Sequence, residues 1–347
     1  MKAVMRPPLL LLCFGLLTVV LAGAQALTGS ALSPADLLAS VTGTADATTA
    51  AVFTDLRLPR VAVGLLAGAC LGVAGCLLQA TLRNPLASPE VTGVGSGAVL
   101  GAVVATVLGG PASDPVALVL LAVAGGTAGG GVLWLVAARA GGDAVRTTVL
   151  GVLVSAVLAG ITLVLLTAKP QLAGSMTRWL VGSLSGRTWE HWTALWPVAL
   201  AAAAAAVVIS PVVDLLRVDD DHALALGVHL PVWRPVVLAV AVLATAAAVA
   251  SVGALVFVGL LAPHLARTIA GGDHRLAVPV AGLAGAATVA LADTLAQAAG
   301  TLLPAVDGQR PGVPAGAVTA LLGAVVMIRI AQRRSAAVAV TTGGGPT

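Results

Sequence analysis

Strongly apolar, uncharged stretches alternate with short polar breaks along most of this 347-residue chain. A helix needs about 20 apolar residues to cross the hydrocarbon core of a bilayer, and most of these stretches approach that length. The pattern therefore predicts an all-α, polytopic membrane protein with about ten transmembrane helices. The predicted spans are 9–26, 61–80, 93–108, 116–138, 149–167, 194–213, 235–251, 254–269, 278–295 and 313–330.

The second and third predicted spans show the pattern most clearly. Arg57 and Arg60 precede the second span, which has no formal charge, and the polar turn 83–90 separates it from the third. Glycines recur inside both apolar runs, and small residues let membrane helices approach each other closely. This stretch predicts a membrane hairpin that packs tightly among other helices.

Composition excludes an ordinary soluble domain. Hydrophobic residues make up 59% of the chain and charged residues 9%, with a mean hydropathy of +1.04. A soluble domain carries about a quarter charged residues. The net charge of +4 would suit nucleic acid, but the arginines are scattered at the ends of apolar runs, where such charges set topology. Cys13, Cys70 and Cys76 lie inside apolar runs without metal-ligand spacing.

An even number of spans puts both termini on one side of the membrane. With the termini in the cytoplasm, most of the 18 lysines and arginines fall in cytoplasmic segments, as the positive-inside rule requires. We therefore predict a multi-pass cell-membrane protein with one transmembrane domain over 1–335 and a disordered tail over 336–347. The first run also resembles a cleaved signal peptide, although its length favours a retained span.

Two polar regions are predicted at the outer surface. Residues 28–55 form an outer loop with a short helix on this interpretation. The sixth span is preceded by a cluster of tryptophans, which prefer the headgroup level and so predict an interfacial helix. The cluster consists of Trp179, Trp189, Trp192 and Trp196.

Segment 215–231, between the sixth and seventh spans, predicts a short capped helix at the cytoplasmic surface. Aspartates at its start can cap free amides, and Gly227 suits a left-handed C-terminal cap. Its alanines and leucines form an apolar face that favours docking of another protein; a helix lying on the bilayer is the alternative. The candidate docking residues are Asp220, Asp221, Ala223, Leu224, Leu226, Gly227 and Val228.

Further residues at the ends of spans are candidates for function. Pro263 predicts a bend or restart of the eighth helix, which brings His264 and Arg267 to the inner surface. A metal site from His264 and His274 is weakly supported because no cysteine or carboxylate set accompanies them, and we expect no bound metal. Asp293, near the outer end of the ninth span, is a membrane-embedded acid and thus a candidate for a proton relay. Because no second titratable group accompanies it, a structural, hydrogen-bonded role is favoured.

Motifs for catalysis are missing from the sequence. The only lysines, Lys2 and Lys169, lie outside any glycine-rich phosphate loop, so the chain has no Walker A site. It also has no nucleophile elbow and no zinc-binding His-Glu-x-x-His helix. We expect neither enzyme activity nor a directly bound cofactor.

Several ordered motifs resemble those of the FecCD family, the membrane permeases of ABC importers for iron–siderophore complexes, haem and cobalamin. The resemblance extends from about Leu56 to Arg334. The matching segments are Arg57-Leu58-Pro59-Arg60, Gln79 with Arg83-Asn84-Pro85-Leu86-Ala87, Gly93 to Gly97, Trp179 to Leu184, Phe257 to Leu260 with Pro263, His264 and Arg267, Asp273-His274-Arg275, Ala292-Asp293-Thr294, and Val313 to Gly316 with Val318 to Ala320.

This resemblance implies the type II ABC importer permease fold and a set of partners. These are a second permease subunit, two ATP-binding subunits that use the ATP, and an extracytoplasmic substrate-binding protein. It assigns the capped helix near 219–230 to contact with the ATPase, and Arg57 and Arg60 to docking of the binding protein. Gln297 departs from the arginine that the family usually carries, and Arg310 is a candidate replacement.

We therefore expect the pathway-forming subunit of a ferric-siderophore importer, driven by partner ATPases. Two alternatives stay open: the same permease carrying haem or cobalamin, and a proton-coupled secondary transporter that acts alone. The sequence specifies neither the chelate nor whether the second permease is an identical copy.

Overall fold

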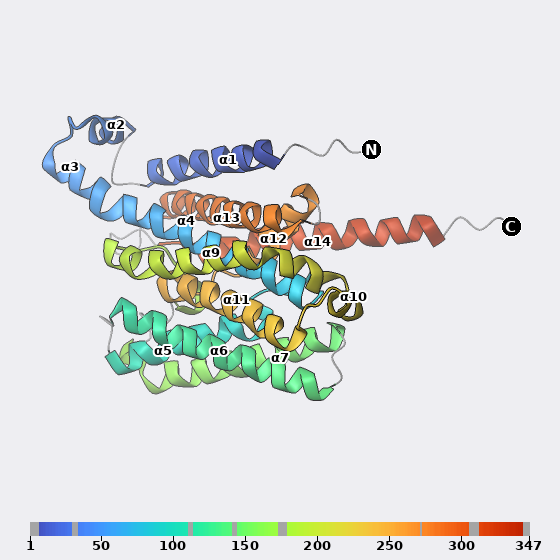
Figure 1. Ribbon diagram of the computed structural model, residues 1–347. Helices are drawn as coiled ribbons and strands as arrows, with labels where there is room; N and C mark the ends of the chain where they lie inside the picture. Colours follow the sequence, from blue (N-terminus) through green and yellow to red (C-terminus); the bar gives the residue numbers. More distant parts are fainter. Residues whose placement is uncertain are drawn as a thin grey trace.

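The computed structural model describes residues 7–29, 34–109, 114–140, 144–172, 179–270, 273–304 and 312–342. Within these ranges all regular secondary structure is helical, which confirms the all-α prediction. By length and composition, seven of the described helical segments can cross a membrane. They contain α1 (Pro7–Leu27), α4 (Leu58–Thr81), α6 (Pro115–Ala140), α7 (Ala144–Ala168), α9 (Trp189–Val218), α11 (Leu230–Val252) and α13 (His274–Leu302), shown in Figure 1.

The other three predicted spans coincide with α5 (Val94–Gly109), α12 (Val258–Ala270) and α14 (Ala315–Thr342). Helix α12 has 13 residues and at about 1.5 Å per residue is shorter than the bilayer core. The prediction that this span begins at residue 254 is wrong, because 253–257 are not helical. Helix α14 continues to Thr342, into the segment predicted to be disordered; 343–347 lie outside the described residues.

The segments predicted to lie at the outer surface contain more helix than the sequence predicted. Residues 28–55 include α2 (Pro34–Thr42) and α3 (Ala47–Ala51), and the π-helical turn η1 (Val52–Arg57) joins α3 to α4 without a break. The tryptophans beyond residue 188 belong to α9 itself, which begins at Trp189, and not to a separate interfacial helix.

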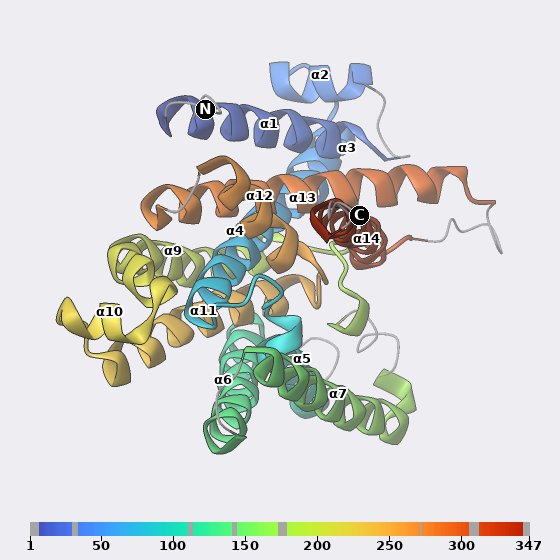
Figure 2. The same ribbon diagram turned by 90° about the vertical axis from the view of Figure 1, so that its right-hand side faces the viewer.

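Helix α4 lies at the centre of the molecule, surrounded by α9, α11, α12 and α13 (Figure 2). Most of its residues are buried, as are those of α11 and α13, whereas few residues of α1 and α7 are buried. Small residues allow this central position. A Cβ atom added at Gly75 would lie 1.8 Å from the carbonyl oxygen of Gly259 in α12. Helix α4 therefore packs backbone to backbone against α12, as the glycine pattern predicted.

The segment 179–187 fills the break between α11 and α12. The Ser183 amide donates to the Val252 carbonyl (2.8 Å), and the Ala254 amide donates to the Trp179 carbonyl (2.9 Å). Gly182 has φ +75°, and its carbonyl accepts from the Gly316 amide at the start of α14. Buried backbone groups need such partners wherever a membrane helix is interrupted. These backbone hydrogen bonds give a structural reason for the motif Trp179 to Leu184.

Candidate functional site

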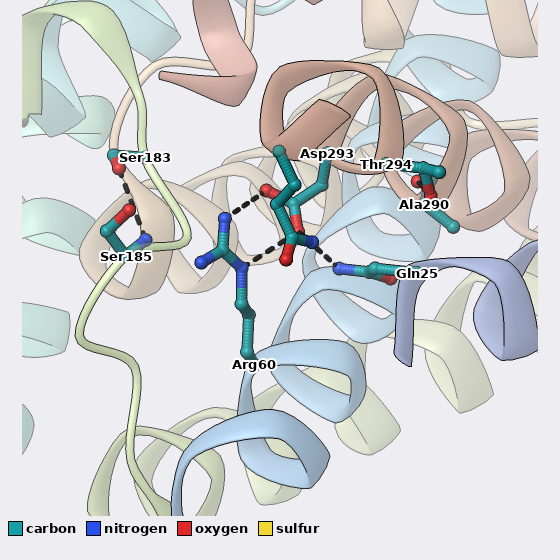
Figure 3. Close-up of polar contacts among 8 residues, drawn as sticks. Gln25, Arg60, Ser183, Ser185, Ala290, Asp293 and Thr294 are labelled. Carbon is teal, nitrogen blue, oxygen red and sulfur yellow. Dashed lines mark hydrogen bonds and ion pairs between the residues drawn. The ribbon is translucent and has the colours of Figure 1, made fainter. Parts of the chain in front are cut away.

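Two polar clusters lie at opposite ends of α4. We call the first the outer polar cluster: Gln25 of α1, Arg60 of α4, and Asp293 and Gln297 of α13. The Arg60 guanidinium binds the Asp293 carboxylate through two bonds, Nε to Oδ2 at 2.9 Å and Nη2 to Oδ1 at 2.7 Å (Figure 3). Asp293 is fully buried. A planar guanidinium and a carboxylate in this geometry form a strong, directional ion pair.

Two amides complete the shell around the Asp293 carboxylate. Gln25 donates from Nε2 to Oδ2 at 2.8 Å, and Gln297 donates to the same oxygen at 3.0 Å. Asp293 thus accepts hydrogen bonds from α1, α4 and its own helix. The expectation that this acid has no titratable or charged partner is wrong: Arg60, 233 positions earlier in the chain, pairs with it. The favoured alternative, a hydrogen-bonded structural aspartate, agrees with this geometry.

The same geometry changes the interpretation of the predicted docking arginines. Arg60 points inward to Asp293, with 22% of its side chain exposed. Arg57 is also partly buried, and its Nη1 donates to the Ala26 carbonyl at the end of α1 (2.5 Å). Arg310 lies outside the described residues. Both described arginines therefore fasten α1 and α13 to α4, and only their remaining exposed surface can meet another protein.

The inner polar cluster consists of Arg83, Asp220 and Arg234, at the other end of α4. Asp220 Oδ1 accepts from the guanidinium groups of both Arg83 and Arg234, the latter at 2.6 Å. Arg83 also donates from Nε to the Leu216 carbonyl at the end of α9 (2.9 Å). Its φ of +49° lies in the left-handed region, which is costly for a residue with a Cβ. These contacts tie α4, α9 and α11 to the short helix α10 (Asp220–Ala225).

Helix α10 matches the predicted capped helix, although only part of it can meet a partner. Asp219 caps its start by accepting from the His222 amide (2.5 Å), and Gly227 has the expected left-handed φ of +81°. Among the predicted docking residues, Ala223 and Val228 are buried. Asp221, Leu224, Leu226 and Gly227 are exposed, and the two leucines expose 52% and 57% of their surface.

The turn after α4 also contacts α7. Asn84 donates its side-chain amide to the Thr148 hydroxyl and accepts from the Leu86 amide at 2.9 Å. Pro85 is exposed between these contacts. The Arg-Asn-Pro turn therefore connects the central helix both to α10 and to α7.

The inner part of α12 differs from its prediction. The sequence predicted a bend or a restart at Pro263; because Pro263 is buried within a continuous helix, the restart is wrong, and the break occurs at 253–257 instead. His264 and Arg267 are partly buried. His274, buried at the start of α13, pairs through Nδ1 with Asp214 of α9 at 2.6 Å. Across the described ranges, no group of three or more His, Cys, Asp or Glu side chains is arranged to hold a metal ion.

A multi-pass helical domain that presents a short capped helix at one membrane surface has the form of a transporter's membrane subunit. The chain matches the model of the FecCD transport family over residues 14–333. It belongs to this family of ABC importer permeases, as the motifs predicted.

Curated relatives and a solved structure agree with this assignment. The chain is 38% identical to the ferric enterobactin transport system permease protein FepG of Escherichia coli K12, over 92% of this chain and 95% of FepG. It is 35% identical to the cobalamin import system permease protein BtuC of Halobacterium salinarum, over 80% of this chain and 73% of the relative. A structure described as an inward-facing conformation of a metal-chelate type ABC transporter matches with a TM-score of 0.77 and 26% identity, covering 94% and 99% of the two chains.

Proposed function

We propose that this permease forms the translocation pathway for a ferric siderophore in the cell membrane, with both termini in the cytoplasm. The observation that carries the proposal is the near full-length similarity to FepG, whose name specifies ferric enterobactin. A second relative, the Escherichia coli permease FecC, is 36% identical and is named for Fe(3+) dicitrate. The cobalamin permease is 35% identical, close to these values, so a cobalamin or haem cargo is the second candidate.

The proposed assembly contains a second permease subunit, identical or homologous, two ATP-binding subunits and an extracytoplasmic binding protein. ATP is bound and hydrolysed by the partner subunits. Helix α10 supports the ATPase contact, because Leu224 and Leu226 expose apolar surface beside the exposed carboxylate Asp221. Docking of the binding protein is proposed for the outer end near Arg57, where exposed charges orient a partner more than they add affinity.

The ATPase contact is testable with one substitution. Leu226→Asp places a charge on the exposed face of α10 and should abolish co-purification of the ATPase, while the permease still inserts in the membrane. Leu302→Asp is the matched control, because Leu302 is 86% exposed at the far end of α13. It should leave ATPase binding unchanged. Full ATPase recovery with Leu226→Asp would refute the contact.

Uptake experiments test the transport function. The complex with its ATPase and binding protein should import ⁵⁵Fe-labelled ferric siderophore into proteoliposomes in an ATP-dependent manner. The permease alone should import none, even under a proton gradient. Gradient-driven uptake by the purified chain would instead support the secondary transporter. Uptake of cobalamin or haem, with no uptake of ferric siderophore, would assign the other cargo.

A further inference from the structure

Glu90 is an acidic residue that belongs to neither the outer nor the inner polar cluster. It begins the 3-10 turn η2 (Glu90–Thr92), between α4 and α5. The hydroxyl of Ser155 in α7 donates to the Glu90 carbonyl at 2.7 Å and accepts from the Gly93 amide at 3.0 Å. This bridge fixes the backbone of η2 against α7. The backbone of Glu90 is therefore held at a defined position beside α7.

The carboxyl lines a cavity of about 170 Å³ between α4, α5, α7, α11 and the break before α12. Its Oε2 atom is buried and finds no hydrogen-bond partner among the described residues. No other lining residue is charged; the remaining polar side chains are Ser96, Thr162 and Thr245. Leaving a buried carboxyl oxygen without a hydrogen-bond partner costs free energy. This oxygen is therefore available to bind a polar group that enters the cavity.

Hydrogen-bond capacity defines the chemistry of this site. Thr162 and Thr245 already donate their hydroxyl hydrogens to carbonyls of their own helices, at 2.9 and 2.8 Å, so only their oxygen lone pairs face the cavity. Burial raises the pKa of Glu90, and a hydrogen bond with the Ser88 side chain acts in the opposite direction. In its neutral form the carboxyl can donate and in its ionised form it can only accept, so together with the Ser96, Thr162 and Thr245 hydroxyls it gives the cavity both donor and acceptor oxygens. An oxygen that both accepts and donates, such as a hydroxyl, fits this set.

The size and position of the cavity indicate which molecule brings that oxygen. The cavity has a volume of about 170 Å³, whereas pockets for small-molecule ligands have volumes of roughly 300 Å³ or more. It is therefore too small for a whole chelate and can hold only one edge of the chelate. Ala159 and Thr162 reach it from α7, the least buried of the seven long apolar helices. An exposed helix of this kind can face a solute pathway or a second subunit.

The geometry points to a solute-contact site at which Glu90 hydrogen-bonds to an oxygen of the chelate as it passes through the permease. This inference rests on the proposed function, because it requires an oxygen-rich solute. Glu90 then contributes to solute selection within the membrane domain, in addition to selection by the binding protein.

Four substitutions test this role in the full complex with its ATPase and binding protein. Glu90→Ala removes the donor, Glu90→Gln keeps a neutral donor of similar size, and Ala159→Leu fills the cavity without touching the acid. Glu190→Gln is the control, because Glu190 is the other glutamate of the chain and is exposed on α9. Uptake of ⁵⁵Fe-labelled ferric enterobactin and ferric dicitrate is measured together with basal ATPase activity and thermal unfolding.

We expect Glu90→Ala and Ala159→Leu to lower uptake about fivefold, the effect of one buried hydrogen bond, with ATPase activity and unfolding temperature unchanged. Glu90→Gln and the control should stay within about twofold of wild type. Wild-type uptake by Glu90→Ala would overturn the inference, as would equal losses of uptake, ATPase activity and stability. A Glu90→Gln variant as impaired as Glu90→Ala would also overturn it. If the wild-type complex imports neither chelate, the proposed function itself fails.

Discussion

Replacing Asp293 with alanine should destabilise the folded permease by about 3–5 kcal/mol, the cost of removing one partner from a buried ion pair. The substitution removes the acceptor of four hydrogen bonds, two from Arg60 and one each from Gln25 and Gln297. It also leaves the Arg60 guanidinium charged with no counter-ion, in a site where 22% of the side chain is exposed. Arg60→Met should cost a similar amount, because the fully buried Asp293 carboxylate then has no cation.

The double variant Arg60→Met with Asp293→Leu measures the interaction between the two charges separately from the cost of changing each residue alone. An apolar pair of similar volume avoids both uncompensated charges, so the double variant should be several kcal/mol more stable than the sum of the single changes predicts. Unfolding titrations in mixed micelles, followed by the fluorescence of the six tryptophans, give these free energies.

Asp55→Ala provides the control, since Asp55 is an exposed acid in η1, at the same end of α4 as Arg60. It should change stability by less than about 0.5 kcal/mol. Additive losses in the double variant, or a cost below about 1 kcal/mol for Asp293→Ala, would show that the outer polar cluster does not stabilise the fold as an ion pair.

Two further predictions follow from the centre and the inner end of α4. Gly75→Val should prevent assembly, because its Cβ would lie 1.8 Å from the Gly259 carbonyl oxygen; normal yield of monodisperse protein would contradict this close packing. Arg83→Ala removes the contacts of α4 with Asp220 and Leu216, so we expect lower uptake per ATP hydrolysed. Uptake per ATP equal to that of wild type would exclude a role of the contact in coupling.

The apolar pattern of the sequence predicted the helices but not the full extent of their interruptions. All ten apolar runs coincide with helices, because length and hydropathy largely determine which segments become helical in a bilayer. The predicted spans 235–251 and 254–269 placed a break at 252–253, where Gly253 caps α11 with φ +77°. Its extension to residue 257 was missed because the non-helical backbone is stabilised by distant partners, such as the bond from the Ala254 amide to the Trp179 carbonyl.

The sequence predicted only part of the candidate site, because some of its features are local and others depend on contacts between distant residues. The N-terminal aspartates and Gly227 of α10 gave its caps, which are local features. The pairing of Arg60 with Asp293 needed two helices to be neighbours in space. One signal was available in the sequence: both residues lie near the outer ends of their predicted spans, so an opposite charge at equal depth was a detectable partner. Glu90 gave no such signal, because its burial arises from four packed helices.

The outer polar cluster has a consequence for how the chain is made. Gln25 and Arg60 emerge from the ribosome long before Asp293, so during synthesis their donors face lipid or the insertion machinery without an acceptor. Only when α13 enters the bilayer can its carboxylate join α1 to α4. Products that stop before residue 293 would retain an unneutralised arginine at the membrane boundary, a feature by which quality-control proteases could distinguish incomplete chains from finished ones.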